Sequence, residues 1–66
     1  MFAHMETNRK KIVMRLEREG WMLRHGGKHD IYQHPKFPDR AIAVPRHREL
    51  SRGVARKIAT DAGWRN

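Results

Sequence analysis

The chain has 66 residues, enough for one domain and too few for separate cofactor-binding and substrate-binding domains. Its 15 Lys and Arg against 7 Asp and Glu give a formal net charge of +8, and a surface this positive indicates phosphates or an acidic protein as the partner. The chain has no cysteine, which excludes disulfides, thiol nucleophiles and cysteine-bound zinc.

We expect a single domain over residues 1–66, in which residues 1–5 are a leader or tag remnant and residues 6–66 form the folded part. No stretch approaches the roughly 18 apolar residues of a membrane span, and the start lacks the features of a secretory signal. The sequence therefore predicts a soluble, cytoplasmic protein without a membrane partner.

The first predicted element is an amphipathic helix over residues 7–19, where apolar residues recur at helical spacing among charged ones. Thr7 or Asn8 can cap its start, and Gly20 can end it. A change to partial apolar–polar alternation after Gly20 then predicts a β-hairpin.

The hairpin strands are expected over residues 21–25 and from residue 28 or 29 to residue 34. Gly26 and Gly27 would supply the two positive-φ positions of a tight turn between them. Pro35 closes the second strand, because proline has no N–H to donate to a ladder.

After a turn over residues 36–39, alternation over residues 40–44 predicts a third strand, antiparallel to the second. Ser51 is a suitable cap for a second helix that ends at Gly63, with Trp64 packing back onto it. The fold class is α+β in the order α-β-β-β-α, because both helices can bury their apolar stripes only on one face of a three-stranded antiparallel sheet.

Alternation along the second strand places His29, Ile31 and Gln33 on one face and Asp30, Tyr32 and His34 on the other. Pattern alone leaves the choice of inward face open. We favour an inward Tyr32, because burying its ring covers more apolar area. His29 then lies on the open face beside the glycines.

Several segments of the chain after Met5 resemble HicA-type toxins. These segments are residues 16–21 (LEREGW), 27–35 (GKHDIYQHP), 43–47 (AVPRH) and 62–64 (AGW). The resemblance implies a fold similar to the double-stranded-RNA-binding domain, ribonuclease activity on mRNA without a cofactor or metal, and inhibition by a HicB-type antitoxin that covers the active site in a hetero-oligomer.

The resemblance implies that His29 is the functional histidine, since it occupies the family's position at the start of the second strand. Lys28 stands where the family usually has serine, and Asp30 stands where a second histidine is common.

The chemistry of RNA cleavage supports His29 independently, because imidazole is the side chain that titrates near pH 7 without perturbation. Tyr32 or His47 is a candidate for a second proton-transfer group. Phosphate contacts are expected from residues of the hairpin and of the segment after the third strand: Arg24, Gly27, Lys28, Arg46 and His47.

A zinc site built from His25, His29 and His34 is disfavoured, because spacings of four and five residues do not bring side chains together along a strand. The alternative function is a non-catalytic double-stranded-RNA-binding module. Such a module reads the shape of the duplex with basic residues, and the same fold and charge would serve it.

Overall fold

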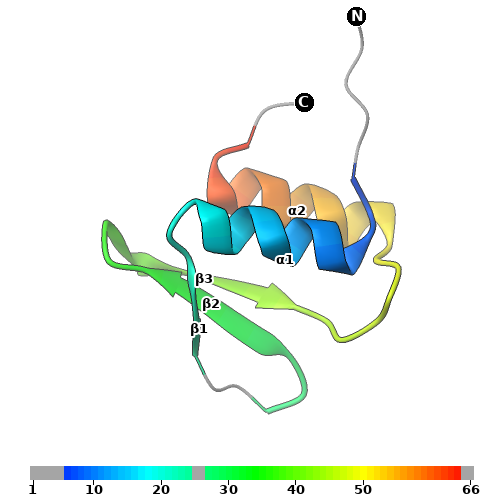
Figure 1. The fold of residues 1–66 in the computed structure, drawn as a ribbon, viewed down its shortest axis with the longest axis horizontal. Coiled ribbons are helices and arrows are strands. Elements are labelled where there is room, and N and C mark those ends of the chain that lie inside the picture. The colour runs from blue at the N-terminus through cyan, green and yellow to red at the C-terminus, as the bar shows by residue number, and fades with distance from the viewer. Residues whose placement is uncertain (1–5, 25–26, 65–66) are drawn as a thin grey trace, which may run out of the picture.

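The computed structural model describes residues 6–24 and 27–64. In these ranges helix α1 (Arg9–Arg18) is followed by strands β1 (Met22–Arg24), β2 (Asp30–His34) and β3 (Phe37–Val44) and by helix α2 (Arg52–Ala62). The strands form one antiparallel sheet in the order β1-β2-β3, and both helices lie on the same side of it (Figure 1). The predicted α-β-β-β-α architecture is confirmed.

Asn8, the second of the two candidate caps, caps the start of helix α1. Its side-chain oxygen accepts a hydrogen bond from the backbone N–H of Lys11 at 3.1 Å. Its end is set by Gly20, which has a φ of +99°. This left-handed residue lets the backbone N–H of Trp21 reach back to the carbonyl of Leu16 at 3.0 Å, the bond that closes a Schellman motif.

Helix α2 has the same design. Ser51 caps its start by accepting from the N–H of Val54 at 3.2 Å. Gly63, with a φ of +81°, ends it, and the N–H of Trp64 donates to the carbonyl of Ala59 at 2.7 Å. A glycine followed by tryptophan thus terminates each helix and returns an aromatic ring toward the core.

The core lies between the helices and the sheet. Its buried members are Ile12, Leu16, Trp21, Tyr32, Ile42, Val44, Leu50, Ala55 and Ile58. Tyr32 is 2% exposed, so the inward orientation expected for its ring is confirmed. Burying an aromatic ring removes roughly 150–250 Å² from water, more than the neighbouring Ile31 could contribute, and this sets the face that β2 turns to the helices.

The register predicted for the hairpin is wrong. A two-residue turn at Gly26 and Gly27 would pair Arg24 with His29, whereas Arg24 pairs with Ile31. Gly26 lies outside the described residues, so the positive φ values expected for the two glycines stay a prediction. With Arg24 opposite Ile31, the connection between β1 and β2 is longer than a two-residue turn.

The third strand begins earlier than predicted, at Phe37, and the turn before it is at residues 35–36. Gln33 pairs with Ala41, whereas the next residue, His34, pairs with Phe37. The intervening residues of β3 therefore bulge. Pro38 is tolerated there because β3 is an edge strand and the bulge spares it a ladder hydrogen bond. In the part of the chain that the structure describes, neither helix is long and apolar enough to cross a membrane.

Candidate active site

His29 is the last residue before β2, and its side chain is exposed. It lines a groove of about 320 Å³ between β3 and α2, a volume at the lower end of the range for small-molecule sites. The other residues that line the groove are Ala41, Ala43, Pro45, Gly53, Val54, Lys57, Ile58 and Asp61. The structure therefore gives His29 both exposure and an adjoining cavity, which a base that acts on a polymer requires.

An ion pair on α2 adds charge to the apolar walls of this groove. Nζ of Lys57 lies 2.9 Å from a carboxylate oxygen of Asp61, and the Lys57 side chain is 77% exposed. Sequence reasoning missed both residues. Lys57 and Asp61 lie three and seven residues after Val54, and residues at these spacings share one face of a helix. This spacing was the sequence signal that could have identified them.

Asp30, directly after His29, holds three segments together. One carboxylate oxygen accepts from Nε of Arg46 at 3.0 Å, and the other accepts from Nη2 of Arg9 at 2.5 Å. Arg9 also donates through Nε to the carbonyl of Pro45 at 2.8 Å. The start of α1, the start of β2 and the loop after β3 are thus locked next to His29.

These contacts change the titration of Asp30. Partial burial of the carboxyl group opposes ionisation, but the hydrogen bonds and positive charges of Arg46 and Arg9 outweigh it and lower the pKa of Asp30 below its usual 3.8. Asp30 is therefore ionised at neutral pH, and it neutralises part of the positive charge around it.

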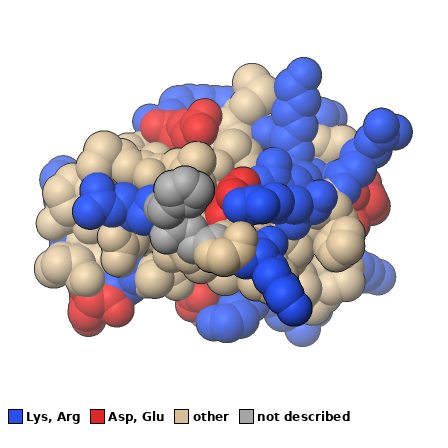
Figure 2. Space-filling view, turned by 90° about the horizontal axis from the view of Figure 1, so that it is seen from below, with Lys and Arg blue, Asp and Glu red and all other residues tan. Residues whose placement is uncertain are grey.

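Two of the predicted phosphate contacts, Arg24 and Arg46, lie at one cavity. Together with Leu23 and Asp30 they line this cavity, which has a volume of about 180 Å³. Seen from the sheet side, Lys and Arg side chains crowd the half of the molecule that carries the loop between β3 and α2 (Figure 2). The fold thus brings arginines from β1 and from this loop together.

The remaining predicted contacts are on exposed segments. Gly27 and Lys28 lie in the connection before β2, and His47 lies in the loop before α2. A Cβ added to Gly27 would have no neighbour within 4 Å, so a ligand has unobstructed access to the backbone there.

Two other residues belong to the framework. The ring of Tyr32 is buried in the core, and burial raises the pKa of its hydroxyl. No RNA can contact it, so the suggestion that Tyr32 is a second proton-transfer group is wrong. His34 has the structural role expected for it. Its Nδ1 accepts from the N–H of Lys36 at 3.0 Å, and its Nε2 lies 2.9 Å from the carbonyl of Glu19.

The described ranges contain no cluster of three or more His, Cys, Asp or Glu side chains that could hold a metal ion. His25, a member of the disfavoured zinc set, lies outside these ranges. Nε2 of His34 already lies at hydrogen-bond distance from the carbonyl of Glu19, so binding a metal there would break the link to α1.

Comparison with known proteins places the chain in a family. The search of curated proteins gave no match. The model of the HicA toxin family of bacterial toxin–antitoxin systems matches residues 9–64, from the first residue of α1 to the tryptophan after α2. With the match extending over both helices and all three strands, the chain belongs to the HicA toxin family.

Proposed function

We propose that this protein is the toxin of a type II toxin–antitoxin pair and a metal-independent endoribonuclease that cleaves mRNA in the cytoplasm, with His29 as the acid/base residue. The observation that carries the proposal is the exposed imidazole of His29 at a groove between β3 and α2, in a chain of the HicA family.

In the proposed reaction the neutral imidazole of His29 removes the proton of a ribose 2′-hydroxyl. The 2′-oxygen attacks the adjacent phosphorus, and the bond from phosphorus to the 5′-oxygen breaks as that oxygen takes up a proton. The products are a 2′,3′-cyclic phosphate and a 5′-hydroxyl. A positioned base contributes about 10²–10⁴-fold to such a step.

Charge that develops on the phosphate is stabilised by cations fixed nearby. Lys57 lines the same groove as His29, while Arg24 and Arg46 line one cavity with Asp30, the residue after His29. Of the two candidates for a second proton-transfer group, His47 is the exposed one, and we assign it that role. A HicB-type antitoxin with an acidic surface would inhibit the enzyme by covering these cations.

The test is cleavage of a labelled RNA in the presence of EDTA by the purified protein and by His29→Ala. The variant is expected to fold normally and to lose about 10²–10⁴-fold in rate. Because His29 is exposed, added imidazole should restore part of the activity of His29→Ala. Cleavage by the variant at the wild-type rate would refute the assignment.

A duplex RNA separates this proposal from the alternative binding module. The toxin is expected to shorten RNA, whereas a double-stranded-RNA-binding module would retard a labelled hairpin in a gel and leave it intact. Co-expression with the protein encoded by the adjacent reading frame tests the partner, since an antitoxin should restore growth.

A further inference from the structure

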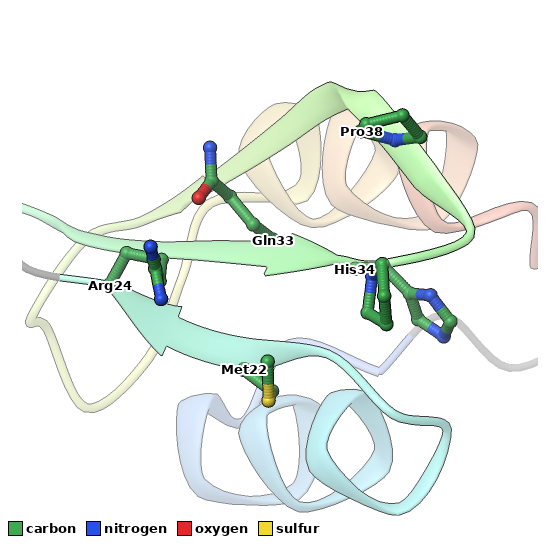
Figure 3. Close-up of a pocket in the computed structure, with 6 residues that line it drawn as sticks. Met22, Arg24, Gln33, His34 and Pro38 are labelled. Carbon is green, nitrogen blue, oxygen red and sulfur yellow. The ribbon is translucent and has the colours of Figure 1, made fainter.

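The side of the sheet that faces away from the helices carries a second cavity, of about 260 Å³ (Figure 3). Figure 3 shows Gln33 on the central strand, with Met22 and Arg24 on β1 to one side and Pro38 on β3 to the other. His34 and Pro35 complete the lining. All three strands therefore contribute to this cavity, which is distinct from the groove beside His29.

The cavity owes its shape to the irregularity between β2 and β3. The register shifts between Gln33 and His34, so β3 bulges and brings Pro38 to the rim. The opposite wall is held in place, because the His34 ring lies 5.2 Å from the Trp21 ring and 5.1 Å from the Phe37 ring. This wall of the cavity is therefore held in place before any ligand binds.

The lining combines flat apolar surfaces with two planar polar groups. Met22 is 54% exposed, and Pro35 and Pro38 are exposed beside it. Gln33 offers an amide that donates and accepts, and Arg24 offers a guanidinium that donates and carries charge. Both of these side chains are exposed.

This chemistry suits one heterocyclic base. Unpaired RNA bases are recognised by packing of their faces against side chains and by hydrogen bonds to their edges. Gln pairs with the N6 and N7 edge of adenine, and Arg pairs with O6 and N7 of guanine. The cavity volume of about 260 Å³ lies just below the range for drug-sized ligands, so the cavity is large enough for one base.

We propose that Met22, Arg24, Gln33 and Pro38 form a subsite for a purine base of single-stranded RNA. The inference rests on the proposed function, since it assigns the subsite to a nucleotide that flanks the cleaved bond. Gln33 is four residues beyond His29, about 13 Å along an extended chain. The bound base is therefore near the scissile phosphate without adjoining it.

The test uses 2′-O-methyl oligonucleotides of a single base type, which cannot be cleaved by 2′-hydroxyl attack, with the wild-type protein and Gln33→Leu. Leucine keeps the approximate volume and removes the amide. The wild type is expected to bind the purine oligomers about tenfold more tightly than the pyrimidine ones, and Gln33→Leu should lose this preference.

Thr60→Leu, a polar-to-apolar change on the exposed side of α2, is the matched control and should keep the wild-type preference. Met22→Ala is a second pocket variant, expected to weaken binding of every base, and circular dichroism checks the fold of each protein. Equal affinity of the wild type for purines and pyrimidines, or a preference unchanged in Gln33→Leu, would overturn the subsite.

Cleavage of natural RNA by the wild type separates this inference from the proposed function. If the protein prefers purines through Gln33 but cleaves no RNA, the subsite is supported and the proposed ribonuclease activity is refuted. Cleavage without such a preference refutes the subsite alone. If Gln33→Leu binds RNA normally but escapes neutralisation by the antitoxin, the cavity is a protein contact and the subsite is wrong.

Discussion

The carboxylate of Asp30 lies 2.9 Å from Nη2 of Arg46, which links the residue after His29 to the loop that carries His47. The side chain of Asp30 is 19% exposed and that of Arg46 is 53% exposed, so water reaches the pair from one side. Arg9 of α1 binds the other carboxylate oxygen. One acidic residue thus orders the surroundings of the candidate base.

The first prediction concerns stability and pH. Asp30→Asn should lower the free energy of unfolding at neutral pH by about 1–2 kcal/mol, because it removes charge-assisted hydrogen bonds to partly exposed partners. The pKa of Asp30 is lower in the folded protein than its usual 3.8. Its stabilising effect is therefore present above that value and is lost as the pH falls through the folded-state pKa.

Urea unfolding followed by tryptophan fluorescence at neutral and acidic pH measures this effect. The difference in the free energy of unfolding between the wild type and Asp30→Asn should shrink as the pH drops below 3.8. Asp39→Asn, at an exposed position of β3, makes the same charge change and should leave stability nearly unaltered. A difference in the free energy of unfolding that stays constant with pH would contradict the role given to Asp30.

The second prediction concerns Gly20. A Cβ at this position would lie 2.7 Å from Nε2 of His34, and the φ of +99° is strained for any L side chain. Gly20→Ala must therefore displace the imidazole that ties α1 to the turn after β2. We expect a loss of about 2 kcal/mol or more in stability, measured by thermal or urea unfolding.

Two other glycines serve as controls for Gly20→Ala. Gly53 lies in the first turn of α2 with nothing within 4 Å of an added Cβ, so Gly53→Ala should stabilise the protein by about 0.5–1 kcal/mol. Gly27→Ala should change stability little, since nothing lies within 4 Å of an added Cβ. Similar effects of all three substitutions would show that contact with His34 is unimportant.

The third prediction concerns Lys57. If this residue contacts a phosphate in the groove beside His29, Lys57→Gln should weaken binding of single-stranded RNA and reduce the slope of log affinity against log salt by about 0.7. Its ion pair with Asp61 is exposed and has i, i+4 spacing, so stability should fall by only about 0.3–0.5 kcal/mol.

The measurement for Lys57 is a salt titration of RNA binding by fluorescence anisotropy. Arg56→Gln removes the same charge from the adjacent, exposed position of α2 and should keep the wild-type slope. Some three phosphate contacts in total predict a wild-type slope near −2, at about −0.7 for each. Equal changes in both variants would mean that Lys57 acts through net charge alone.

The amino-acid sequence determined the order of the elements and their boundaries at the helix ends. Ser51, Gly20 and Gly63 are local signals, because a cap or a left-handed residue acts on the backbone within a few positions of itself. The resemblance of residues 27–35 and 62–64 to HicA toxins was likewise detectable in the sequence, and the family match over residues 9–64 supports it.

The strand connections were less predictable. Gly26 and Gly27 match a tight turn in composition, but Arg24 pairs with Ile31 and not with His29, and strand register depends on packing across the sheet. The early start of β3 at Phe37 has a similar cause. Stacking of Phe37 on Trp21, with ring centroids 6.0 Å apart, joins segments that no local pattern connects.

The sequence by itself thus determined the layered α-β-β-β-α fold, the helix ends and His29 as the residue to examine, because these follow from short-range backbone preferences, periodicity and motif. Only the tertiary structure decided that Lys57 of α2 shares a groove with His29 and that Asp30 joins Arg9 to Arg46. These pairs are far apart along the chain, and contacts between them arise when the helices pack on the sheet.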